Sequence, residues 1–295
     1  MSNNSKIERA QSGILADLPN HGRYLELRIS SGAAKPVLIE CLQRLQAQVD
    51  GEGVVVGFGS RLLQYFGVDD LDLHFKSYDQ HQVSVPSTAA DLWIWIRSEE
   101  AGFTFHQSEL ILDGLADGFD VVAITDGFKF NGGRDLTGYE DGTENPTGDD
   151  AIDAALQADG SSIVAVQKWR HNLRHFSSLS QDEQDDIIGR RLSDNVEFEG
   201  SPSSAHVKRT AQESFDPEAF MVRRSMPYSE GEHAGLMFVC FAHSTQPFNQ
   251  QMNRMVGGED GITDGLFQFS QPITGAFYWC PPVKDEQLDL SKLSI

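Results

Sequence analysis

Carboxylates, glycine and an Asn-Pro turn lie close together between Gly138 and Pro146, in the run Gly-Tyr-Glu-Asp-Gly-Thr-Glu-Asn-Pro. Such a density of carboxylate oxygens is typical of calcium sites. An EF-hand loop counted from Asp141 needs glycine at its sixth position and glutamate at its twelfth, but these positions hold Pro146 and Ile152. The calcium hypothesis therefore fails, and composition alone leaves a solvated acidic turn as the alternative.

The nine histidines form neither an HExxH motif nor a Cys/His zinc pattern. His171 and His175 are four residues apart, so on one helix they would face the same side and could share a metal. The hydrophobic pattern instead places them at the end of a strand over 162–169, which argues against a shared metal. His206 lies before a strand that carries Arg223, and taken alone it is an ordinary polar histidine.

Both halves of the chain show the same order of predicted elements, βαββαβ. In the first half, hydrophobic periodicity predicts alternating strands and helices over residues 24–29, 36–49, 54–58, 92–96, 106–115 and 120–125. In the second half, the corresponding segments are strand 162–169, a helix opened by the capping box Ser180-x-x-Glu183, strands 220–224 and 235–241, helix 246–255 and strand 274–279. We therefore expect an α+β protein of two ferredoxin-like halves, each with helices on one face of an antiparallel sheet.

The expected boundary between the halves lies near residue 150, so that residues 1–150 form the N-terminal unit and residues 151–295 the C-terminal unit. A long loop over residues 127–153 joins them, and loops of that length tend to be functional or disordered. Glycines at positions 132, 133 and 142 let the backbone of this loop approach a ligand closely. We expect an ordered loop with a function.

The composition excludes several classes of partner. The chain has 295 residues, and 23 Lys and Arg against 44 Asp and Glu give a net charge of −21. A surface this acidic repels phosphate backbones and anionic lipids, so we expect no nucleic acid and no membrane partner. The three cysteines are too few for a disulfide framework, and the N-terminus lacks a signal peptide, so we expect a cytoplasmic protein.

Three segments taken together resemble a known family. Glu140-Asp-Gly-Thr-Glu-Asn-Pro146 is followed about sixty residues later by Ser-Ala-His206-Val, and then by Val222-Arg-Arg-Ser-Met-Pro-Tyr228. In order and spacing these segments look like those of the dye-decolourising peroxidases. Gly57-Phe-Gly59, Asp91-Leu-Trp-Ile94 and Ile273-Thr-Gly-Ala-Phe-Tyr278 resemble the family as well. The compact length is similar to that of the small bacterial P-type (formerly B-type) members, and the family's fold of two ferredoxin-like halves agrees with the predicted elements.

The resemblance implies a haem b cofactor in the second half and a set of site residues. It makes His206 the iron ligand, Asp141 the acid–base group that moves the peroxide proton, and Arg223 the group that stabilises charge as the O–O bond breaks. Ser225 shares the strand face of Arg223 and would bond the distal water or peroxide. Asp264 resembles the carboxylate that accepts the second ring N–H of the iron ligand, and its alternative is a turn aspartate before glycine.

The activity implied is a peroxidase that reduces hydrogen peroxide and oxidises small aromatic or dye-like donors through a ferryl intermediate. Two alternatives stay open: an enzyme that releases iron from haem, and a non-enzymatic haem carrier, which has no use for the Asp141 and Arg223 pair. Tryptophan or tyrosine side chains could relay electrons to donors too large to enter the site, and the candidates are Trp93, Trp95, Trp169, Trp279, Tyr139 and Tyr228.

We further expect a homo-oligomer, because a structural dimer is among the possibilities for this fold. The aliphatic tail from Leu288 to Ile295 is either a frayed end or a docking peptide, since some relatives use tails to enter a protein cage. An encapsulating protein cage is therefore a possible partner.

Overall fold

The structure is a computed structural model, and it describes residues 3–80 and 83–295. The elements of the first half that the sequence predicts are all present: β1 (His21–Ile29), α2 (Lys35–Gln46), β2 (Val54–Phe58), β5 (Leu92–Ser98), α4 (Ala101–Leu115) and β6 (Phe119–Phe128). Three short elements lie between them: α3 (Ser60–Tyr65), β3 (Tyr78–Gln80) and β4 (Val83–Val85). A short helix α1 (Asn3–Ile7) and a 3-10 turn (Ser12–Ile14) precede them.

The second half holds more helix than the sequence predicts. Its elements are α5 (Gly148–Ala155), β7 (Ser162–His171), α6 (Leu173–Ser178), α7 (Gln181–Ile188), α8 (His206–Arg209), β8 (Val222–Arg223), β9 (Met226–Glu230), β10 (His233–Ala242), α9 (Gln246–Met255), β11 (Ser270–Pro272), β12 (Ala276–Cys280), β13 (Val283–Lys284) and β14 (Gln287–Leu288). Three further 3-10 turns cover Gln212–Ser214, Gly265–Gln268 and Ser291–Leu293. The capping box at the start of α7 is present as predicted.

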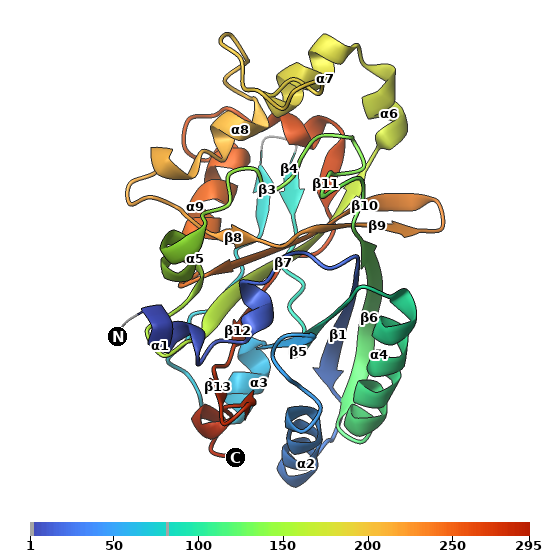
Figure 1. Ribbon diagram of the computed structural model, residues 1–295, viewed down its shortest axis with the longest axis vertical. Helices are drawn as coiled ribbons and strands as arrows, with labels where there is room; N and C mark the ends of the chain where they lie inside the picture. Colours follow the sequence, from blue (N-terminus) through green and yellow to red (C-terminus); the bar gives the residue numbers. More distant parts are fainter. Residues whose placement is uncertain (1–2, 81–82) are drawn as a thin grey trace.

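The sheet is antiparallel and closes on itself. Among the described residues ten strands lie in the order β11-β7-β12-β2-β5-β1-β6-β9-β10-β8. A further pairing of β7 with β10, from Ile163 opposite Ala242 to Arg170 opposite Gly235, joins the two ends into a ring. The first half supplies the run β2-β5-β1-β6, and the second half supplies β12-β7-β10-β9 (Figure 1).

Two short seams hold the halves together in the ring. At one seam Trp279 of β12 pairs with Phe58 of β2, and at the other Gly127 of β6 pairs with Tyr228 of β9. The ring interior is packed with aromatic side chains, of which the largest are Tyr24, Trp93, Trp95, Tyr228, Phe241 and Tyr278. Gly57 is required near the first seam, because a Cβ there would meet the Cβ of Tyr278 at 2.7 Å.

Helices cover the outer face of the ring. Helices α2 and α4 pack on β1 and β5 of the first half, and α9 lies against the second half, with α6, α7 and α8 beyond it (Figure 1). Helix α4 buries Thr104 and Ser108 and leaves Phe103 and Leu110 exposed. None of the helices in the described part of the chain is long and apolar enough to cross a membrane.

The C-terminal tail is packed on its own core. Leu288, Leu290 and Leu293 are all buried. The Gln46 side chain donates a 2.6 Å hydrogen bond to the Leu288 carbonyl. Lys292 forms an ion pair with Asp70, which lies in the loop between α3 and β3. The tail is therefore not frayed, and its aliphatic residues are not free for docking.

Candidate active site

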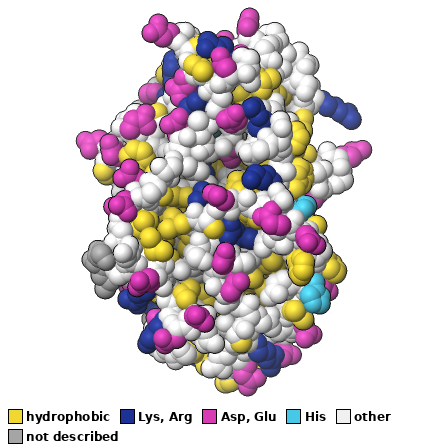
Figure 2. Space-filling view, viewed as in Figure 1, with side chains coloured by type: hydrophobic (Ala, Val, Ile, Leu, Met, Phe, Trp, Pro, Cys, Tyr) yellow, Lys and Arg dark blue, Asp and Glu magenta, His cyan; other side chains and the backbone are white. Residues whose placement is uncertain are grey.

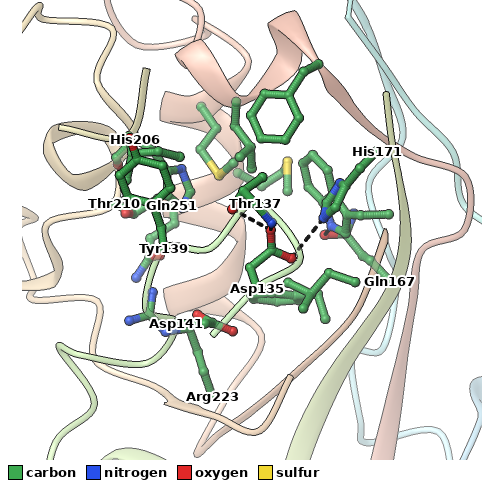
Figure 3. Close-up of a pocket in the computed structure, with 18 of the residues that line it drawn as sticks. Asp135, Thr137, Tyr139, Asp141, Gln167, His171, His206, Thr210, Arg223 and Gln251 are labelled. Atoms are coloured by element: carbon green, nitrogen blue, oxygen red, sulfur yellow. Dashed lines mark hydrogen bonds and ion pairs between the residues drawn. The ribbon is translucent and has the colours of Figure 1, made fainter. Parts of the chain in front are cut away.

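A cavity lies outside the ring, between the sheet of the second half and helices α8 and α9. Its walls are largely apolar, with side chains from β7, β10 and α9 and from the turn after α9, among them Trp169, Leu236, Phe238, Phe248, Met252 and Phe269. Three of the predicted site residues, Asp141, His206 and Arg223, line this cavity (Figure 3).

His206 is the first residue of the single-turn helix α8. Its Nδ1 lies 2.8 Å from Oδ2 of Asp264, whose side chain is fully buried. The other ring nitrogen, Nε2, has no hydrogen-bond partner in the part of the chain that the structure describes, and the ring lines the cavity. An imidazole in this state can offer Nε2 to a metal, while the carboxylate holds its orientation and raises its basicity.

Asp264 makes two side-chain contacts, one with a turn and one with His206. Its Oδ1 accepts the Leu266 N–H at 2.8 Å and so caps the 3-10 turn Gly265–Gln268, while Oδ2 contacts His206. The Asp264 N–H in turn donates to the carbonyl of Met255 at the end of α9. The turn and the histidine contact are therefore two properties of one carboxylate.

Asp141 and Arg223 lie at the end of the cavity away from His206 (Figure 3). The Arg223 Nε is buried without a partner, and neither side chain has a hydrogen bond or ion pair within the described residues. Asn145 holds the two segments together, because its Oδ1 accepts the Arg223 N–H at 2.8 Å and its Nδ2 donates to the Arg223 carbonyl at 3.0 Å. The Asp141 carboxylate and the Arg223 guanidinium thus face the cavity from two segments that Asn145 holds together.

The loop that carries Asp141 is further fixed to the protein around it. Arg134 pairs with Glu140 at 2.7 Å, and the Asp141 N–H donates to the Gly133 carbonyl. Gly142, next to Asp141, has a φ of +75°, a conformation that favours glycine. These contacts tie the loop to its surroundings, and only its last residues, in α5, are helical.

One polar pair in the cavity wall was not predicted. Oδ2 of Asp135 lies 3.1 Å from Nε2 of His171, whose Nδ1 is 2.6 Å from Oγ of Ser270. Burial alone would raise the pKa of Asp135, but the hydrogen bonds from His171 and Thr137 bring this pKa below its usual value. The sequence has no local signal for this pair, because its members are 36 residues apart and come from a loop and a strand.

Other predicted residues lie outside the main cavity. Ser225 is buried and lines a small adjoining pocket together with Asp141, and its Oγ accepts the Val239 N–H at 3.4 Å. The Arg224 guanidinium donates to the Leu15 carbonyl at 2.7 Å, and it does not line the cavity as Arg223 does. His175 is exposed in α6 while His171 ends β7, so the two do not share a helix face.

No cluster of three or more His, Cys, Asp or Glu side chains that could hold a metal ion occurs in the described ranges. The six aromatic residues considered as electron relays, Trp93, Trp95, Trp169, Trp279, Tyr139 and Tyr228, are all buried. Only Trp169 and Tyr139 of these six line the cavity. Burial and the neighbouring Asp185 carboxylate raise the pKa of Tyr139.

Family models match most of the chain. Residues 132–285 match the model described as "Dyp-type peroxidase, C-terminal", and residues 49–129 match "Dyp-type peroxidase, N-terminal". The chain belongs to the Dyp-type peroxidase family. Its enzyme class is therefore that of a peroxidase, an oxidoreductase. The dye-decolorizing peroxidase of Mycobacterium tuberculosis is 33% identical over 246 residues, covering 78% of this chain and 73% of that protein.

Solved structures of Dyp-type peroxidases share the fold. An encapsulated DyP-type peroxidase from Mycobacterium smegmatis is 26% identical with a TM-score of 0.85, over 93% of this chain and 96% of that one. A variant of the DypB peroxidase from Rhodococcus jostii, in complex with heme, is 28% identical with a TM-score of 0.82, over 91% and 94% of the two chains. These likenesses confirm the mixed α/β fold with antiparallel strands.

Proposed function

We propose that this Dyp-type peroxidase binds haem b in the cavity of its second half, reduces hydrogen peroxide there and oxidises small aromatic or dye-like donors. The observation that carries the proposal is the His206–Asp264 couple, which leaves Nε2 of His206 as a free ligand in an apolar cavity. The walls of the cavity are aromatic and aliphatic, which suits the flat and largely apolar ring of haem. Among the residues that the structure describes, Arg223 is the only cation in the lining without a partner. The heme complex of the Rhodococcus jostii protein supports the same choice of cofactor.

His206 would hold the iron through Nε2, with Asp264 keeping the proton on Nδ1. When bound, haem would supply the redox-active iron for the two-electron reduction of hydrogen peroxide. Asp141 accepts a proton from one peroxide oxygen and returns it to the other, which leaves as water. Arg223 donates hydrogen bonds to the departing oxygen and stabilises its negative charge. Ser225, from the adjoining pocket beside Asp141, would hold a water at the same place.

The donor is proposed to be a small aromatic molecule, which suits the aromatic and aliphatic walls of the cavity. The protein is proposed to be a homo-oligomer, and the exposed apolar residues Phe103 and Leu110 on α4 support self-association. An encapsulating cage stays possible as a partner, as for the Mycobacterium smegmatis protein, but the packed tail gives no free docking segment.

We also infer that each half is a ferredoxin-like unit. The support is the strand order, since β6-β1-β5-β2 and β9-β10-β7-β12 both place the first and third strands of a βαββαβ unit at the centre. Residues 1–150 and 151–295 are the proposed units, with the Asp141 loop contributed by the first. A cytoplasmic location is proposed because Cys41, Cys240 and Cys280 are all free and buried.

The test is reconstitution of the purified protein with haem, followed by absorption spectra before and after addition of hydrogen peroxide. We expect a Soret band, a rapid spectral change with peroxide, and return to the resting spectrum as an aromatic donor is oxidised. Iron-free porphyrin among the products would support iron release instead. Slow bleaching without donor oxidation would support a haem carrier and contradict the proposal.

A further inference from the structure

The helix that presents His206 is too short to orient it. Helix α8 has four residues, His206–Arg209, and a single turn of helix is not stable without contacts from outside. His206 itself contributes one such contact, to Asp264. The one buried residue of this helix is Arg209, which is 4% exposed and lies three residues after His206.

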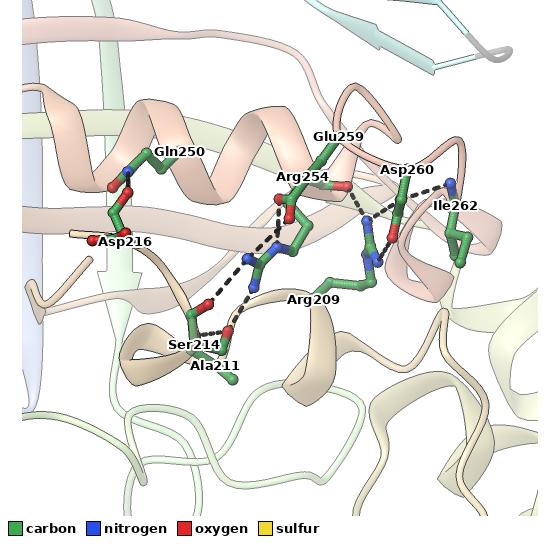
Figure 4. Close-up of polar contacts among 9 residues, drawn as sticks. All are labelled: Arg209, Ala211, Ser214, Asp216, Gln250, Arg254, Glu259, Asp260 and Ile262. Atoms are coloured by element: carbon green, nitrogen blue, oxygen red, sulfur yellow. Dashed lines mark hydrogen bonds and ion pairs between the residues drawn. The ribbon is translucent and has the colours of Figure 1, made fainter. Parts of the chain in front are cut away.

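Arg209 anchors α8 to the turn that follows α9. Its Nη1 donates to Oδ2 of Asp260 at 2.7 Å and its Nη2 to Oδ1 at 2.8 Å, so that the guanidinium and carboxylate meet in a two-point contact (Figure 4). The same Nη2 donates to the carbonyl of Arg254 at 2.7 Å, on the last turn of α9. A two-point contact of this kind fixes the relative orientation of the guanidinium and the carboxylate as well as the distance between them.

The turn that receives Arg209 also carries the partner of His206. Asp260 and Asp264 are four residues apart. Asp260 lies inside a turn that is closed by a backbone bridge between Val256 and Thr263, and Asp264 directly follows this bridge. The Asp260 Oδ1 accepts the Ile262 N–H at 2.9 Å, which ties the side chain into the turn. The helix and the turn are thus joined twice, once by Arg209 with Asp260 and once by His206 with Asp264.

We propose that Arg209 and Asp260 are positioning residues for the iron ligand. They hold α8 against the turn so that Nδ1 of His206 stays aligned with Oδ2 of Asp264 and Nε2 stays directed into the cavity. Arg209 contacts neither the cavity nor His206, so its effect acts through this alignment. The inference rests on the proposed role of His206 as ligand.

A second ion pair nearby offers a matched control. Glu259 accepts from Nε of Arg254 at 2.7 Å, and Arg254 also donates to Oγ of Ser214 (Figure 4). The Arg254 guanidinium lies over the Phe215 ring as well. This pair is part of the same network and has the same charges. It braces α9 against Ser214 and does not join α8 to the Asp264 turn, so losing Glu259 should leave the ligand in place.

The experiment compares Arg209→Gln with Glu259→Gln in the haem-loaded protein, using the ferric/ferrous reduction potential and the iron–histidine stretching frequency of the ferrous form. Because a weaker Nδ1 hydrogen bond makes the imidazole less basic, Arg209→Gln should raise the potential and lower the frequency. Its haem affinity should fall by about tenfold, the low end of the usual loss for residues that support a ligand. Glu259→Gln should match the wild type in all three measurements.

Equal values of potential and frequency for the two variants would overturn the proposal, even if both lower the melting temperature. Arg209→Lys keeps the positive charge but cannot make the two-point contact, so its reduction potential should lie between those of the wild type and Arg209→Gln. If Arg209→Gln does not fold, Asp260→Asn gives the same comparison while keeping the Arg209 bond to the Arg254 carbonyl. A His206→Ala protein with the wild-type iron–histidine band would instead reject the ligand assignment itself, whatever Arg209 does.

Discussion

At the scale of single residues, the side chains of the site differ in whether their hydrogen bonds are used within the protein or left free for a ligand. Asp264 uses one oxygen to cap a turn and the other to hold His206, so that the orientation of the ring is built into the fold. Asp141 and Arg223, in contrast, have no side-chain partner among the described residues and are free to act on a ligand. Substitutions at these positions should therefore separate binding from chemistry.

His206→Ala should remove stable haem binding, because no second side chain that could ligate the iron lies in a matching position. The measurement is the haem content of the purified variant and the position of its Soret band. A variant with normal haem content and an unchanged ferric spectrum would contradict the assignment of His206.

Arg223→Leu should slow the reaction with peroxide more than Asp141→Asn does. Removing one donor that stabilises developing charge costs a factor of about 10² to 10³ in rate, whereas water can partly replace a carboxylate that moves a proton. Stopped-flow mixing of the ferric protein with peroxide gives both rates. The opposite order would exchange the two roles, and wild-type rates in both variants would remove both residues from the mechanism.

Asp264→Asn should raise the ferric/ferrous reduction potential and slow peroxide cleavage, while haem stays bound. The amide oxygen can still accept the Leu266 N–H, so the turn is kept, but a neutral partner makes His206 less basic. Potentiometric titration of the fully loaded, folded variant measures the effect. An unchanged potential would leave Asp264 with its turn role alone.

At the scale of elements, the acidic loop and strand β8 act as one unit. Strand β8 is at the edge of the sheet, and the Asn145 amide binds both backbone groups of Arg223 where a further strand would pair. Asp141 is four residues before Asn145 in the same loop. The Asn145 amide thus holds the loop that carries Asp141 against the backbone of Arg223.

Asn145→Ala should lower the rate with peroxide at least tenfold and leave haem binding intact. It should also cost about 1–3 kcal/mol of stability, because two hydrogen bonds are lost. The control is Ser180→Ala, which removes the capping box of α7 at a cost of about 1 kcal/mol without contact to Arg223. If both variants lose the same fraction of the rate, the loop is not positioned by Asn145.

Much of this element order can be predicted from the sequence, and the reasons for the exceptions are physical. Periodicity predicts β1 and α9, and unbroken apolar runs predict β5 and the end of β10; β5 is buried on both faces. The strand expected over 220–224 is only β8, and β9 was not predicted, because Pro227 and two arginines interrupt the apolar pattern. His206 and Asp264 came from the resemblance, since a contact between residues 58 apart has no local signal. Arg209 with Asp260 and His171 with Asp135 were missed for the same reason.

At the scale of the whole molecule, acidic side chains are spread over the surface and do not gather in one patch on the face that Figure 2 shows. Glu26 is one of the buried carboxylates, because its side chain points into the closed ring and it is 9% exposed. Burial raises the pKa of Glu26 to about 7, although Lys168 and Arg28 lower it in part. The peroxidase mechanism does not use this group.

Glu26→Gln should stabilise the protein above pH 7 and weaken the dependence of its stability on pH. The unfolded chain loses this proton near pH 4.5 and the folded chain near pH 7, so stability falls as the pH rises through that window. Removing the ionisable group should recover at most about 3 kcal/mol at pH 8. Melting temperatures at pH 5 and pH 8 measure this, with the exposed Glu40→Gln as control, and an equal pH dependence in wild type and variant would contradict the prediction.

The seam between β12 and β2 sets an order of events during synthesis. Strand β2 leaves the ribosome early, but its partner residue Trp279 is made more than two hundred residues later. Until β12 is made, β2 and β7 each have one edge with unpaired backbone groups, the edge that later pairs with β12. Such edges are prone to association with other chains. The nascent chain should therefore depend on chaperones for most of its translation, and haem should be retained only after release from the ribosome.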